Sequence, residues 1–225
     1  MRILIVYNTA LDGRSVSGVQ RHFAGVTRHW VSAGHTVDFF VARAAWPVFR
    51  DLYPHSRLIS SDNRFDATGY LESTWRYAFP YAWRMVTGHV ARIPGDYDLI
   101  YACCQAIFET HPARVLARRK GAALGVKVHH VVSAQGSRAG FFDRLFLTSE
   151  RWSARLLNRH ADVILCSTPP VAADFRRLEE NLHLPPRDTK VVGYGLDFTD
   201  LPFSAELPKA FDAVLLGRMH RHKGV

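Results

Sequence analysis

Residues 2–7 read RILIVY and residues 34–41 read GHTVDFFV, and these two stretches decide the fold class. The first is a continuous apolar run, which is typical of a strand buried on both faces of a parallel sheet. Between the two stretches, apolar residues recur at the spacing of one helix face, at Val19, Phe23, Val26 and Trp30. Gly34 is placed to end that helix, and residues 36–41 predict the next strand. Strand, helix and strand in this order form a βαβ unit.

The same alternation resumes after residue 97. Further strands are predicted at 98–103, 126–132, 162–166 and 190–192, and helices at 111–120, 141–160 and 171–182. Residues 44–96 show no regular period, and Pro80 is expected to kink or break any long helix there. Repeated strand–helix pairs predict an α/β fold with a doubly wound, Rossmann-like parallel sheet covered on both faces.

The end of the chain predicts a second domain that is truncated. Residues 1–197 form the first domain, and residues 198–210 contain two prolines without periodicity, which is typical of a linker. Residues 211–225 contain another short apolar strand that no helix follows. A strand of this kind has to be covered on both faces, so we expect it to begin a second domain.

The charge of the chain favours anionic partners. Lys and Arg number 29 against 20 Asp and Glu, a formal net charge of +9. Phosphates, sugar diphosphates, anionic lipids and nucleic acid all suit such a surface. No nucleic-acid motif accompanies the charge, so nucleic acid is not an expected partner.

Cysteine usage and hydropathy indicate the compartment. Three cysteines, two of them adjacent, make neither a disulfide framework nor a zinc site, so we expect no bound metal. Reduced thiols are typical of a cytoplasmic protein, which is the compartment that we expect. No apolar run approaches the length of a bilayer span, so membrane contact would be peripheral, at the inner membrane. Residues 44–96 mix aromatic and basic residues, which suits a membrane surface. A helical insertion that packs its rings on the sheet is the alternative.

Small and polar residues follow the predicted strands, at the edge where open parallel sheets bind ligands. They are Asn8, Cys103, Cys104, Gln105, Ser133, Ala134, Gln135, Gly136, Ser167, Thr168, Gly193, Tyr194 and Gly195. Ordinary strand-to-helix turns have a similar composition, so both a cleft floor and simple turns stay open.

Two segments are candidates for binding a diphosphate. Ser17 and Gly18 stand at the start of the first predicted helix, where free N–H groups and a partial positive charge favour phosphate. A capping box between Ser17 and Gln20 explains the same residues without a ligand. At the chain end, Arg218 and Lys223 follow a strand that ends in glycine, and both can neutralise a departing diphosphate. A merely basic chain end is the alternative.

Four stretches in order resemble the retaining, GT-B-fold glycosyltransferases of family 4. They are the opening residues 2–6 with 17–22 and 34–37, the run 161–167 similar to "ADxVxxxS", residues 191–197 similar to "xxPNGVD", and residues 216–225 similar to "xGRxxxxKGx". Two of them depart from the family pattern. The usual double glycine is Ser17-Gly18, and the "PNG" turn is Gly193-Tyr194-Gly195.

The resemblance implies a cleft between an acceptor-binding and a donor-binding domain. The nucleotide sugar is then a substrate, the acceptor is a glycan or a lipid-linked molecule, and no further cofactor is needed. Gly18, Ser17, Arg218 and Lys223 would bind the donor diphosphate, and Arg218 and Lys223 would act in catalysis. The acceptor side of the cleft would be lined by Arg14, Arg21, Gln135, Gly136, Ser167 and Tyr194.

The family's histidine just past the fifth strand has no certain counterpart. Gln135 fits that position best, because His129 and His130 are predicted to lie within the strand. Packed or surface imidazoles are favoured there over a catalytic role. The sequence therefore predicts the amino-terminal part of a retaining glycosyltransferase that is inactive as the short chain. The alternative is a non-catalytic, basic α/β module that binds an acceptor, a membrane surface or a partner subunit.

Overall fold

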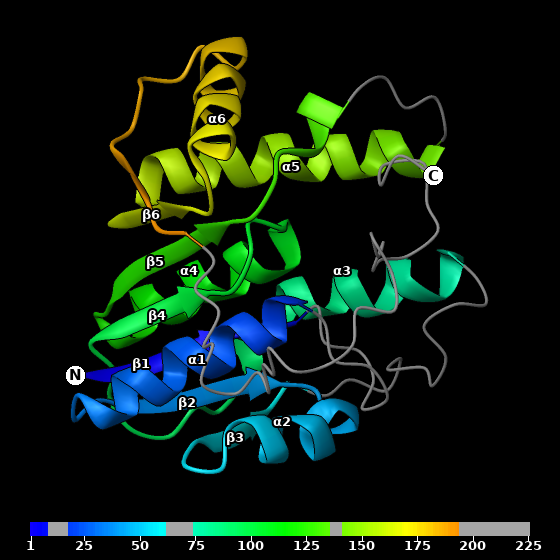
Figure 1. Cartoon of the computed structure of the whole chain (residues 1–225). Helices are drawn as coiled ribbons and strands as arrows, with labels where there is room; N and C mark the ends of the chain where they lie inside the picture. Colours follow the sequence, from blue (N-terminus) through cyan, green and yellow to red (C-terminus); the bar gives the residue numbers. More distant parts are fainter. Residues whose placement is uncertain (9–17, 62–73, 136–140, 194–225) are drawn as a thin grey trace, which may run out of the picture.

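The strands form one parallel sheet in the computed structural model, which describes residues 1–8, 18–61, 74–135 and 141–193. They are β1 (Arg2–Val6), β2 (Thr36–Val41), β3 (Arg57–Ser60), β4 (Leu99–Ala102), β5 (Ala123–Val128), β6 (Val163–Cys166) and β7 (Thr189–Val191). All seven pair in parallel, in the order β3-β2-β1-β4-β5-β6-β7 (Figure 1). The predicted doubly wound parallel sheet is confirmed.

Helices cover both faces of this sheet. They are α1 (Gly18–Ser32), α2 (Trp46–Leu52), α3 (Thr74–Val90), α4 (Ile107–Lys120), α5 (Phe141–His160) and α6 (Pro169–Asn181), with the short 3-10 helices η1 (Arg43–Ala45) and η2 (Val132–Gln135). One face carries α1 and α2, and the other carries α4, α5 and α6, with α3 packed against α4 (Figure 1). No helix in the described part of the chain has the length and apolar character needed to span a membrane.

The two faces of the sheet have different cores. Aromatic rings fill the α1 side, where Phe49 meets Phe39 and Tyr7 edge to face at centroid distances of 5.3 Å. Mainly aliphatic side chains fill the other side, including Leu116 of α4 and Leu157 of α5, both fully buried. Burial of each such side chain contributes about 1.5–3 kcal/mol to the driving force for folding.

The segment from 44 to 96 is more regular than the sequence predicts. It holds α2, the unpredicted strand β3 and a helix, α3, that runs unbroken through Pro80, so the expected break is wrong. The part of α3 that follows Pro80 packs against α4. Tertiary contacts of this kind override local helix propensity.

Several aromatic and basic residues of this segment are buried in its described part. Phe49 and Arg84 are fully buried, and Tyr53 is nearly so. Trp46 is half-buried beneath two guanidinium groups, those of Arg43 and Arg50. For these residues the alternative holds, namely a segment that packs its rings on the sheet.

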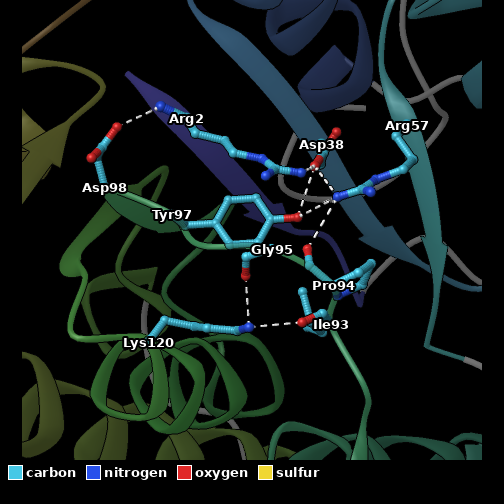
Figure 2. Close-up of polar contacts among 9 residues, drawn as sticks. All are labelled: Arg2, Asp38, Arg57, Ile93, Pro94, Gly95, Tyr97, Asp98 and Lys120. Atoms are coloured by element: carbon cyan, nitrogen blue, oxygen red, sulfur yellow. Dashed lines mark hydrogen bonds and ion pairs between the residues drawn. The ribbon is translucent and has the colours of Figure 1, made fainter.

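A polar cluster joins the strands at their amino ends (Figure 2). We call Arg2, Asp38, Arg57 and Tyr97 the amino-edge cluster. The buried Asp38 carboxylate accepts hydrogen bonds from Tyr97 Oη at 2.7 Å and Arg57 Nη2 at 2.7 Å, and Arg2 Nη2 lies 3.5 Å away. Burial and the Asp38 carboxylate raise the pKa of Tyr97 to about 12, so its hydroxyl stays a donor. The cluster fixes β1, β2 and β3 at the edge opposite the expected binding edge.

Candidate functional site at the carboxyl edge of the sheet

The candidate site lies where the strand order reverses, between β1 and β4. From β1 the chain proceeds outward to β3 and then returns to β4 on the other side. Loops on the two sides of such a switch point diverge and leave a crevice at the carboxyl ends of the strands. Helix α1 begins at this edge with Gly18, so its first backbone N–H groups are directed here.

Two histidines stand directly past β5. The strand ends at Val128, so the prediction that His129 and His130 lie within it is wrong. Past Val128 the Gln105 side chain provides the hydrogen bonds of the β5 backbone. Its Oε1 accepts from His129 N at 3.3 Å and its Nε2 donates to His130 O. This side chain bonds the backbone where a neighbouring strand would otherwise pair with it, so the pairing of β5 ends at Val128. Both histidines therefore lie at the carboxyl edge.

His129 is packed into the floor of this edge. Its ring Nε2 lies 2.8 Å from Cys103 O, and because a carbonyl only accepts, Nε2 carries the proton. Its own carbonyl accepts from Ser167 Oγ at 3.0 Å. The ends of β4, β5 and β6 are thereby tied together through one imidazole and one hydroxyl.

A buried lysine adds positive charge beside the histidines. Lys127 of β5 points to the α1 face, where its Nζ donates to His22 Nε2 at 2.8 Å and lies 3.3 Å from Val192 O. Burial lowers the pKa of Lys127, and burial together with the Lys127 charge lowers the pKa of His22 to about 4. Near neutral pH, His22 is therefore a neutral acceptor for the lysine.

The low pKa of His129 predicts a loss of stability in acid. Burial, with smaller contributions from nearby cationic groups, lowers its pKa to about 4. Between pH 6.5 and 4 the unfolded chain binds more protons than the folded one, so the stabilisation is complete above pH 6.5 and is lost as the pH falls. This group alone should remove about 2 kcal/mol of unfolding free energy between pH 7 and pH 5.

Urea unfolding of His129→Gln at the two pH values tests this expectation. The variant should lose about 2 kcal/mol less than the unmodified chain on acidification. His55→Gln, at an exposed position, is the matched control and should leave the pH difference unchanged. Equal pH differences in His129→Gln and the unmodified chain would show that the imidazole titrates normally.

Asn8 has a structural task at this edge. Pro112 within α4 has no N–H, so the carbonyl of Phe108, four residues earlier, lacks its helical donor. Asn8 Nδ2 supplies the missing hydrogen bond at 2.8 Å, and Asn8 O accepts from the buried Arg84 at 2.7 Å. The end of β1 is thereby joined to both α4 and α3.

We expect Asn8→Ala to destabilise the chain by about 2 kcal/mol, because it leaves a buried carbonyl without a donor. In a Pro112→Ala background the helix regains its own N–H, so the same substitution should cost about 1 kcal/mol less. Chemical denaturation of the four proteins in this double-mutant cycle gives the coupling. A coupling of zero would mean that the asparagine does not replace the proline's absent donor.

Two thiols and a carboxylate meet at the end of β4. Burial raises the pKa of the Cys103 thiol well above its usual value, and the thiol donates to Glu109 Oε2 at 2.6 Å. The same oxygen accepts from Cys104 N at 3.2 Å. Ligand atoms of the three residues lie within 4.8 Å of one another, a grouping that the sequence did not predict. Hydrogen bonds within the group account for this arrangement.

The predicted site residues are only partly within the described part of the chain. Gly18 begins α1, Arg21 lies on α1 and Gln135 ends η2, with the side chains of Arg21 and Gln135 outside the described part. Ser167 is at the carboxyl edge, but it is buried and donates to His129 O. The other predicted site residues lie outside the described ranges, namely Arg14, Ser17, Gly136, Tyr194, Arg218 and Lys223.

Sequence reasoning missed Lys127 and His22 altogether. Lys127 interrupts an otherwise apolar strand, GVKV at residues 125–128. A charged residue between two apolar strand residues could have indicated a functional lysine. His22 follows the Gly18 turn by one helical turn, so a basic side chain on the inner face of α1 was predictable.

Comparison with known proteins identifies the family and the fold of the chain. A family model described as "Glycosyl transferase 4-like domain" matches residues 17–195. The fold is similar to that of Alr3699/HepE from Anabaena, solved with UDP and glucose, at 18% identity over 88% of this chain and 46% of that one, TM-score 0.54. It is also similar to UGT89C1 from Arabidopsis thaliana, solved with UDP, at 13% identity over 93% and 52% of the two chains, TM-score 0.57.

The chain is shorter than the solved proteins that it resembles. It spans about half the length of the two solved structures, and no curated protein sequence matches it. At identities below one fifth, the structural likeness shows the fold, a Rossmann-like half of the GT-B architecture. The family match covers most of the chain from Ser17 onward. The chain therefore belongs to the glycosyl transferase 4-like domain family.

Proposed function

We propose that the chain is the acceptor-side part of a glycosyltransferase that moves a sugar from a nucleotide-sugar donor to a glycan or lipid-linked acceptor with retention of configuration. The observation that supports this most directly is the meeting of the α1 start at Gly18 with Lys127, His22 and His129 at the switch point of a family-4-like sheet. Anionic groups of the substrates are stabilised by such a combination of helix terminus and buried cation.

The donor in this proposal is a nucleoside diphosphate sugar. HepE was solved with UDP and glucose and UGT89C1 with UDP, which supports a uridine diphosphate sugar as the first candidate. Its diphosphate would be held between the N-terminus of α1 and the predicted cations Arg218 and Lys223. Those two cations would stabilise the departing diphosphate, and Lys127 would add positive potential from the floor of the site.

The proton chemistry follows from the neutral imidazoles. Burial, with a smaller contribution from the Lys127 charge, lowers the pKa of both His22 and His129. Both rings therefore have low basicity and serve to orient polar groups. The two carboxylates nearest this edge in the described chain, Glu109 and Glu150, already accept hydrogen bonds from the protein. In a front-face retaining reaction the departing phosphate receives the acceptor's proton, which suits a site whose described carboxylates already accept hydrogen bonds from the protein.

Amide chemical shifts of the isotope-labelled chain provide the test. UDP-glucose should shift the amides of Gly18, Val19 and His130 and leave those of Gly95 and Asp98 at the opposite edge unchanged. Lys127→Gln should weaken binding roughly tenfold, as expected for one nearby charge. Lys120→Gln, at the opposite edge, changes the net charge equally and should bind normally. Shifts confined to any other surface would refute the placement of the donor.

Transfer itself is expected to need more than this chain. The donor half of the cleft begins at Arg218 in our proposal, and both walls have to be in place to orient the reacting groups. The purified 225-residue chain should therefore transfer no sugar from labelled UDP-glucose to lipid or glycan acceptors. Rapid transfer by the purified chain would contradict this division between the two halves.

A further inference from the structure

The outer face of α3, α4 and α5 has no exposed acidic residue in the described part of these helices. Within residues 81–90, 107–120 and 144–160 the acidic residues are Glu109 and Glu150, and both are buried. Basic residues are exposed or half-exposed over the same surface: Arg114, Arg118, Arg119, Arg144, Arg151, Arg155, Arg159 and His160. We call this surface the basic helical face.

The centre of the basic helical face is a hollow between α4 and α5. It has a volume of about 250 Å³ and is lined by Arg114, Arg155, Leu156, Arg159 and His160. It is separate from the carboxyl-edge site, since these residues lie in the second halves of their helices. Among described residues, none of the three arginines has an ion-pair partner. Like charges gathered in this way repel one another, so the cluster does not stabilise the fold.

Positive charge on these helices also affects two histidines. Burial and the charges of Arg114, Arg159 and Arg118 lower the pKa of His160. Burial, His89 and Arg114 lower the pKa of His111, which lies on α4 one turn before Arg114 and contacts His89 of α3. An anion in the hollow would relieve this repulsion.

Apolar side chains border the cations. On α5, Trp152 is 58% exposed and Leu145, seven residues earlier on the same side of the helix, is 49% exposed. On α3, Trp83 and Val90 are exposed as well. Indole rings and aliphatic side chains beside arginines are typical of surfaces that rest at the headgroup level of a membrane. Nucleic acid would use the cations but not these apolar neighbours.

We propose that the basic helical face binds the surface of a bilayer rich in anionic lipids, with a lipid phosphate in the hollow between Arg114, Arg155 and Arg159. The exposed Trp152 and Leu145 enter the headgroup layer beside it. The cations of this contact lie on α4 and α5, and α3, which belongs to the aromatic segment 44–96, borders them with Trp83 and Val90. The proposal does not depend on which sugar the protein transfers.

Flotation of the chain with lipid vesicles tests the proposal. Vesicles of phosphatidylcholine with 30% phosphatidylglycerol should bind the chain, and pure phosphatidylcholine should not. Binding should fall steeply between 0.1 and 1 M NaCl, as the Debye length falls from about 10 Å to about 3 Å. Arg155→Glu/Arg159→Glu should bind at least roughly twentyfold more weakly, since each cation near such a surface contributes about fivefold.

The control variant changes the same charge on the other face of the sheet. Arg28→Glu/Arg50→Glu alters exposed residues of α1 and α2 and should bind vesicles as the unmodified chain does. Trp152→Ala should weaken binding at every salt concentration and leave the salt dependence intact. Circular dichroism melting confirms that each variant is folded, and the Arg155/Arg159 variant should melt no lower than the parent.

Three results would overturn the proposal. Equal binding to neutral and anionic vesicles would show that the cations have no role. Equal losses of vesicle binding in both double variants would show that only the net charge of the chain matters, not the position of the arginines. Retention of the chain on duplex DNA at salt concentrations that release it from anionic vesicles would assign the face to nucleic acid instead.

Discussion

Replacing Asp38 by alanine is expected to lower the free energy of unfolding by about 3 kcal/mol, the lower end of the cost of breaking a buried ion pair. The carboxylate is 2% exposed and is the shared acceptor for Tyr97 and Arg57 (Figure 2). Without it, the buried Tyr97 hydroxyl loses its acceptor. The lower end applies because Arg57 and Arg2 are partly exposed and can turn to water.

Urea denaturation at pH 7 measures this loss. Asp174→Ala is the matched control, because Asp174 pairs with Arg177 at the same distance of 2.7 Å but on an exposed part of α6. A surface pair of this kind contributes at most about 0.5 kcal/mol. If the two variants were equally stable, the amino-edge cluster would have no special part in holding the strands together.

Replacing Gly88 by alanine is expected to destabilise the chain by about 3 kcal/mol, the upper end of the cost of overpacking. A methyl group at this position of α3 would lie 2.7 Å from Pro112 Cα and 2.8 Å from Pro112 O. Both atoms belong to the backbone of α4, so relief requires the two helices to move apart. Such a movement would also disturb the bond from Asn8 to Phe108 O.

Gly25 in α1 provides the opposite expectation for the same substitution. A methyl group there would meet no atom within 4 Å, so Gly25→Ala should stabilise the chain by up to about 1 kcal/mol through helix propensity. Thermal unfolding of both variants gives the comparison. Two changes of the same sign would mean that the distance between α3 and α4 does not decide the outcome.

The regular part of the fold was predictable because each element has one dominant pattern. β1 is apolar throughout after Arg2, and β2 is apolar except for Thr36 and Asp38. α5 carries an amphipathic period from Phe141 to His160, its observed bounds. β3 was not predicted, because its four residues are only partly buried and show no alternation. The start of α4 at Ile107 was also missed, since Pro112 argues against a helix until its replacement donor, Asn8, is known.

The candidate site was predictable as a place but less so as a set of residues. Strand ends of a parallel sheet meet at one edge, so Gly18 and Ser167 could be placed there from the sequence alone. The exact end of β5 depends on Gln105, a side chain from a different loop, and this contact moves His129 and His130 out of the strand. Pairing of Lys127 with His22 joins residues of β5 and α1, and no local pattern encodes it.

The strand order also affects how the chain folds while it is being synthesised on the ribosome. β1 is central in the sheet, with Ile3 paired to Val37 on one side and to Leu99 on the other. During synthesis the first three strands are available long before Leu99 emerges, and until then β1 offers an open hydrogen-bonding edge. Such an edge is a template for pairing with other chains. The nascent protein should therefore need chaperone protection until its fourth strand arrives.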